Sequence, residues 1–174
     1  MTKVSTPMEA AAGFLTVVNS SSQGLLGGYL ILNALGRPLE FHCTAPIKPN
    51  RAQEILYGAT LMPFIYGEQI GQTLVRATQL KVPLVVTDLA PLLAAAELVE
   101  EPLLLLLPQP GDPAIPPGVI PLKTHGGRLA LAKNRMANLA DVTAAAARLG
   151  ESFDWHEPFG RIRDAIGEAQ RAAA

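Results

Sequence analysis

The chain has 174 residues, of which 49% are apolar and 17% are charged. A disordered chain shows the opposite balance, so these values indicate a compact core. The formal net charge is −1, whereas a nucleic-acid-binding surface depends on clustered positive charge, so the composition predicts no nucleic-acid partner. The single cysteine, Cys43, excludes an internal disulfide and any metal site that needs several cysteines.

Two segments bear on targeting and membranes. The first nine residues contain no apolar run, so they do not resemble a secretory signal. The most apolar run, 103–107, lies between two prolines and is far shorter than the roughly 20 residues that span a bilayer. We therefore predict a soluble, cytoplasmic chain without a membrane partner.

The first third of the chain predicts β-structure. Three runs rich in β-branched and apolar residues are separated by short turn clusters: 14–19, 29–33 and 39–44. Short strands with short turns predict an antiparallel meander. Gly27 and Gly28 indicate either a bulge or the close approach of another element.

Helical signals follow this meander. Asn50 with Gln53 three residues later forms a variant of the capping box, which predicts a helix over 51–57. A second helix is predicted over 63–80, because three apolar residues recur there at helical spacing: Ile70, Leu74 and Ala77.

The middle of the chain predicts a βαβ unit. Apolar strands are predicted over 82–86 and 103–107, with a helix over 89–99 between them. Strands that are apolar on both faces are typical of a covered, mostly parallel sheet. Asp88 then lies at the carboxyl end of the first of these strands.

The last third is less regular. Six prolines fall between positions 108 and 121, which predicts an extended, irregular surface segment. A strand is predicted over 129–132, followed by a helix between Asn138 and Gly150 and a last helix from Pro158. No internal repeat is present.

These elements predict the fold class α/β. A single domain over 13–174 has a mixed sheet, in which the N-terminal antiparallel meander is followed by the βαβ unit and C-terminal helices. Residues 1–12 are predicted to be a flexible N-terminal segment.

The strand-to-helix junction between His42 and Arg51 holds the main candidate site. Alternate side chains of a strand share a face, so Glu40 and His42 lie about 7 Å apart on the polar face. A carboxylate at this spacing can tune an imidazole for acid or base chemistry. A solvated sheet face explains both residues without any function and is the commoner case.

Lys48, Asn50 and Arg51 form the candidate ligand-binding set. The two cations flank a helix start that is already partly positive, where free backbone donors can hold a carboxylate or a phosphate. Arg51 can instead pair with Glu54 at i, i+3. No glycine-rich phosphate loop accompanies these residues.

Three further predictions concern single residues. Asp88 is a catalytic candidate, because ligands of open α/β sheets bind near the carboxyl ends of strands, although a helix N-cap is its simpler role. Cys43 shares a strand face with Leu39 and Phe41, which predicts a buried structural thiol. The three histidines are scattered and no cofactor motif is present, so neither a metal nor a cofactor is predicted.

Two hypotheses of function follow. The main one is a non-catalytic binding, adaptor or regulatory module that self-associates or binds a protein partner, because no catalytic motif is complete and the charge is low. The alternative is a small-molecule enzyme or anion-binding protein that uses the junction. In it His42 acts as acid or base, Glu40 orients it, and Lys48 and Arg51 hold an anionic ligand.

Overall fold

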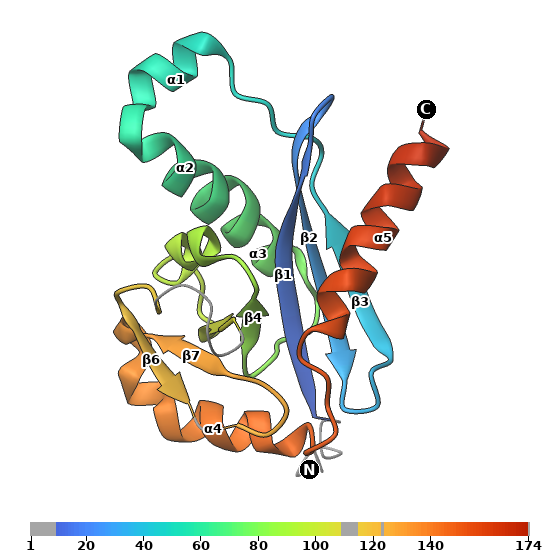
Figure 1. Cartoon of the computed structure of the whole chain (residues 1–174), viewed down its shortest axis with the longest axis vertical. Helices are drawn as coiled ribbons and strands as arrows, with labels where there is room; N and C mark the ends of the chain where they lie inside the picture. The colour runs from blue at the N-terminus through green and yellow to red at the C-terminus, as the bar shows by residue number, and fades with distance from the viewer. Residues whose placement is uncertain (1–9, 109–114, 123, 174) are drawn as a thin grey trace, which may run out of the picture.

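A seven-stranded mixed sheet forms the centre of the structure, which is a computed structural model (Figure 1). The structure describes residues 10–108, 115–122 and 124–173. The strand order is β3-β2-β1-β4-β5-β7-β6, in which β1, β4 and β5 run parallel and the other neighbouring pairs are antiparallel. The predicted α/β class is confirmed, with N-terminal antiparallel strands and C-terminal helices in one domain.

The N-terminal meander consists of β1 (Ala11–Ser20), β2 (Gly24–Asn33) and β3 (Pro38–Cys43). Gly24 has a φ of 92°, a left-handed value that suits glycine, and it closes the turn between β1 and β2. The strands begin earlier than predicted. Residues 11 and 12 of the predicted flexible segment belong to β1, and residues 1–9 lie outside the described residues.

The parallel strands β4 (Val85–Thr87) and β5 (Leu103–Leu106) are fully buried, as expected for a sheet covered on both faces. Their connection contains the 3₁₀-helix η3 (Ala90–Ala95) rather than the α-helix predicted over 89–99. The prediction of a helix was therefore wrong in type, because apolar spacing over one or two turns does not distinguish the two windings.

The helical segment after β3 begins with α1 (Arg51–Tyr57), where both hydrogen bonds of the capping box are present. The single helix predicted over 63–80 is instead a composite. A short 3₁₀-helix, η1 (Gly58–Thr60), precedes it. The composite then consists of α2 (Leu61–Pro63), the π-helix η2 (Phe64–Gln72) and α3 (Thr73–Ala77). π-Helices are rare, are usually limited to a single turn, and are frequent at functional sites.

Helices cover both faces of the sheet (Figure 1). One core lies under α4 (Leu139–Arg148) and α5 (Glu157–Ala172), and the other lies under η2, α3 and η3. A Cβ atom on Gly27 would lie 2.3 Å from Ile70, and one on Gly28 would lie 2.3 Å from Ile162. Gly27 and Gly28 therefore let a helix approach each face closely. Of the two predicted explanations for this pair, a bulge or a close approach, the close approach is confirmed.

The far edge of the sheet contains β6 (Val119–Leu122) and β7 (Leu129–Ala132). The strand predicted over 129–132 is confirmed, whereas β6 forms within the segment predicted to be irregular. Proline is tolerated in β6 because it is an edge strand. Residues 109–114 of that segment lie outside the described residues, and the 3₁₀-helix η4 (Lys133–Asn138) leads into α4.

Among the described residues, no helix is both long enough and apolar enough to cross a membrane.

Candidate functional site

An open groove runs along the junction between β3 and α1, and we call it the junction groove. The end of β3 and the following residues form one wall, while η2 and α3 form the other. Its larger hollow has a volume of about 540 Å³, which is within the usual range of small-molecule sites. The hollow is lined by His42, Cys43, Thr44, Ala45, Pro46, Ile47, Gln69, Thr73, Leu74 and Ala77.

A smaller hollow of about 250 Å³ continues the junction groove toward α1. The two hollows share Pro46, Ile47 and Gln69, so they form one elongated depression. Lys48 lines the smaller hollow together with Gln53 and the apolar side chains of α2 and η2. The groove thus has an imidazole at one end and an ammonium group at the other.

Glu40 and His42 form a hydrogen-bonded pair beside the larger hollow. The distance between His42 Nε2 and Glu40 Oε2 is 2.8 Å. An ionised carboxylate can only accept hydrogen bonds, so Nε2 carries the hydrogen and Nδ1 is the basic nitrogen of the neutral ring. This is the pairing that their alternation along β3 predicts.

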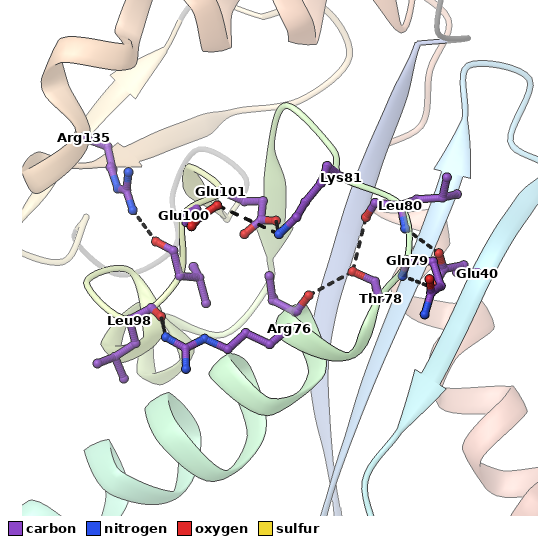
Figure 2. A network of polar contacts seen from close by, with 12 residues as sticks. Glu40, Arg76, Thr78, Gln79, Leu80, Lys81, Leu98, Glu100, Glu101 and Arg135 are labelled. Atoms are coloured by element: carbon purple, nitrogen blue, oxygen red, sulfur yellow. Dashed lines mark hydrogen bonds and ion pairs between the residues drawn. The ribbon is translucent and has the colours of Figure 1, made fainter.

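Glu40 has two further partners in the segment that follows α3. Its carboxylate accepts hydrogen bonds from the backbone N–H groups of Gln79, at 3.1 Å, and Leu80, at 2.7 Å (Figure 2). The hydrogen bond from His42, together with these two, holds the pKa of Glu40 below its ordinary value, against the opposite effect of burial. The side chain of Glu40 is only 15% exposed, so this carboxylate is fixed in place.

The candidate ligand-binding residues have separate positions. Lys48 is exposed and lines the junction groove. Asn50 is occupied by the capping box, in which its Oδ1 accepts from Gln53 N at 2.9 Å. Arg51 is exposed and pairs with Glu54 at 3.2 Å. Lys48 is therefore the member of this set that faces the groove.

Asp88 lies on the other face of the sheet from His42. His42 is opposite Tyr29, which packs under η2 and α3, whereas Asp88 is paired with Arg163 of α5. Asp88 Oδ1 also accepts from Thr16 Oγ1 at 2.6 Å. The N-cap role predicted for Asp88 is wrong, since Leu89 precedes η3 and no side chain caps it.

Cys43 is exposed, so the prediction of a buried thiol is wrong. Its face of β3 also carries Leu39 and Phe41, each 40% exposed. Alternation correctly grouped these three side chains, but β3 is an edge strand and this face is left largely uncovered. An apolar pattern predicts which residues share a face and cannot show whether another element covers it.

The groove wall formed by η2 and α3 was not predicted from the sequence. Gln69 lines both hollows and Thr73 lines the larger one, yet neither belongs to a motif. A π-helix changes which side chains share a face, so helical spacing could not have located them. In the described part of the chain, no three His, Cys, Asp or Glu side chains are grouped so that they could hold a metal ion.

No protein-family model and no curated protein matches the chain. Among solved structures, a human ENDOV chain is similar, with 14% identity and a TM-score of 0.49, over 95% of this chain and 86% of that one. A chain of Ciona intestinalis endonuclease V, solved with a 23mer DNA containing an inosine followed by a ribo-adenosine, has 12% identity and a TM-score of 0.45. That match covers 92% of this chain and 86% of the other. At these identities the likeness concerns the fold.

Two predictions are corrected by this comparison. The chain was predicted to be a non-catalytic adaptor that self-associates or binds a protein, with no nucleic-acid partner, whereas the solved chains of similar fold are endonucleases and one of them holds DNA. The absence of local motifs and a net charge near zero were too weak to support those predictions. Sites are built on folds from residues that are distant in sequence, and an average charge does not describe one local surface.

Proposed function

We propose that this chain is an enzyme-like protein that binds a small anionic molecule in the junction groove. The observation that carries the proposal is the Glu40–His42 pair, whose imidazole borders a hollow of about 540 Å³. An imidazole oriented by a fixed carboxylate is a common arrangement for general acid or base chemistry. Its Nδ1 nitrogen is the group that would accept or donate the proton.

Lys48 supplies the charge preference of this site. It lies at the other end of the same groove, separated from His42 by the shared segment of Pro46 and Ile47. An ammonium group makes charge-assisted hydrogen bonds to carboxylate or phosphate oxygens, which are stronger than neutral ones. The substrate class is therefore an elongated molecule with an anionic group at one end and a titratable or polar group at the other.

The proposal is tested by two-dimensional NMR titration of the folded protein. The probes are inorganic phosphate, small mono- and dicarboxylates and nucleoside monophosphates. A short inosine-containing DNA is added because one of the solved chains of similar fold was determined with such a DNA. We expect at least one probe to shift the backbone signals of Ile47, Lys48 and Gln69 and the ring signals of His42.

Two lysine variants make the test specific. Lys48→Ala should weaken binding of the active probe by about tenfold or more, the loss expected for a hydrogen bond to a charged group. Lys133→Ala removes another exposed lysine, on η4, and should leave the affinity unchanged. Equal affinities of the two variants, or the absence of shifts along the groove with every probe, would contradict the proposal.

A further inference from the structure

Glu40 links β3 to the segment that follows α3, next to the junction groove. Its carboxylate accepts hydrogen bonds from the N–H groups of Gln79 and Leu80 in that segment. Among the described residues, no other side chain of β3 makes a hydrogen bond to this segment. In the part of the chain that the structure describes, this carboxylate is therefore the one side chain of β3 that links the strand to residues 79–80 by hydrogen bonds.

The same carboxylate also selects the tautomer and the orientation of the His42 ring. Glu40 Oε2 lies 2.8 Å from His42 Nε2 and 3.1 Å from the nitrogen of Gln79, so one oxygen atom serves the ring and the opposite wall together. Any movement of residues 79–80 away from β3 removes two of the three hydrogen bonds that position this carboxylate. The position of residues 79–80 and the orientation of the imidazole cannot then change independently.

The segment after α3 is anchored on its other side as well (Figure 2). Lys81 Nζ lies 3.3 Å from Glu101 Oε1, close to the start of β5, and Arg76 donates to the carbonyl oxygen of Leu98. The Lys81 contact restrains residues 79–81 without touching His42, and the Arg76 contact restrains α3. Removing the Lys81 contact therefore loosens the segment without a direct change at the ring.

We propose that Glu40 is a positioning residue that couples the docking of residues 79–80 on β3 to the tautomer and orientation of His42, which lines the junction groove. This inference extends the proposed function, and its relevance to ligand binding rests on that function. When residues 79–80 are docked, Glu40 holds the hydrogen on Nε2 and leaves Nδ1 basic. When they are released, the carboxylate loses its fixed position and the ring loses its orientation.

The coupling is tested without any ligand, so its failure can be distinguished from failure of the proposed function. Glu40→Gln supplies one acceptor oxygen where the carboxylate supplies two, and its NH₂ group can donate to the ring. We expect the amides of Gln79 and Leu80 to exchange with solvent about tenfold faster or more, as expected for lost charge-assisted hydrogen bonds. We also expect the ¹⁵N signals of the His42 ring to show loss of the Nε2–H form.

Lys81→Met loosens the same segment from the other side, without touching Glu40 or His42. It should speed exchange of the Gln79 and Leu80 amides, and the coupling then requires the His42 ring signals to shift in the same direction as in Glu40→Gln. If Glu40→Gln leaves both the exchange rates and the ring signals unchanged, the inference is overturned. It is equally overturned if Lys81→Met speeds this exchange while the His42 ring signals stay as in the unchanged protein.

A measurement on the unchanged protein covers the case in which Glu40→Gln does not fold. Scalar couplings across hydrogen bonds should connect the amide nitrogens of Gln79 and Leu80 with the side-chain carboxyl carbon of Glu40. If both scalar couplings are absent while other couplings across backbone hydrogen bonds are detected, the proposed role of Glu40 is refuted. If both are present but no probe shifts the protein signals along the groove, the proposed ligand binding is refuted and the proposed role of Glu40 remains.

Discussion

The phenol group of Tyr29 lies directly over Gly13 on the neighbouring strand. A Cβ atom at Gly13 would lie 2.1 Å from Tyr29 Oη and 2.5 Å from its ring, far inside van der Waals contact. Tyr29 is 1% exposed, and burial raises the pKa of its hydroxyl well above the ordinary value. The ring therefore has little freedom to move away, and the two residues depend on each other.

Gly13→Ala should lower the free energy of unfolding by about 3 kcal/mol, at the upper end of the usual cost of overpacking a core. Urea unfolding of the single variant gives this value. In a Tyr29→Leu background the same change should cost less, because the ring is gone. Equal costs in the two backgrounds would show that Tyr29 is not the obstacle.

Gly27→Ala should also destabilise the protein, by about 1–3 kcal/mol, because its Cβ would overlap Ile70 of η2. Gly167→Ala is the control. Gly167 lies inside α5, and a Cβ atom there would meet nothing within 4 Å, so alanine should stabilise the helix by about 0.5–1 kcal/mol. The prediction fails if thermal unfolding shows the same shift for both variants.

Asp88→Ala should cost about 1–3 kcal/mol, because it leaves the hydroxyl of Thr16 without its acceptor in a fully buried position. Arg163→Ala removes the other partner of Asp88, but the arginine side chain is 45% exposed, so its loss should cost no more than about 1 kcal/mol. Urea unfolding of both variants tests the difference. If Arg163→Ala lowers the free energy of unfolding more than Asp88→Ala does, the ion pair with Arg163, and not the hydrogen bond to Thr16, is the main contribution of Asp88.

The pH dependence of stability should carry the signature of Glu40. Its pKa is lower in the folded protein than its ordinary value, so the folded state gains stability above that ordinary value. This gain is lost as the pH falls through the lowered folded pKa, because Glu40 is then protonated in both states.

Unfolding of the unchanged protein and of Glu40→Gln, measured from pH 7 down to about pH 3, tests this sign. The difference in unfolding free energy between the two should be largest near neutral pH and should shrink in acid. A difference that is independent of pH, or one that grows in acid, would contradict the role of the ionised carboxylate.

Cys43 should react with a thiol reagent in the folded protein, because its side chain is exposed. Cys43→Ser should change the free energy of unfolding by no more than about 0.5 kcal/mol, as surface substitutions usually do. Labelling that requires denaturant would show that the thiol is shielded after all.

Local features of the sequence predicted local structure well. The capping box at Asn50 located the start of α1, and alternation along β3 correctly placed Glu40 beside His42. Both depend on neighbours within three residues, where spacing determines geometry. The three N-terminal strands and the strand at 129–132 were found for the same reason.

Features that depend on distant residues were not predictable in this way. The winding of η2 occurs where Gly67 and Gly71 pack closely on Ala94 and Ala95 of η3, a contact between separate segments. Exposure of Cys43 depends on the position of β3 at the sheet edge. The partners of Glu40 lie 39 and 40 positions away, so no motif could reveal them.

The docking of α5 onto the N-terminal strands has a consequence for the order of folding. Arg161 of α5 donates to the carbonyl oxygen of Gly36, a contact between residues 125 positions apart, and Phe159 packs on Phe14 in the same core. Contacts of such long range form slowly, because a long loop must close first. A growing chain that has not yet made α5 therefore holds a hairpin with one uncovered apolar face, and this is the surface on which aggregation would begin during synthesis.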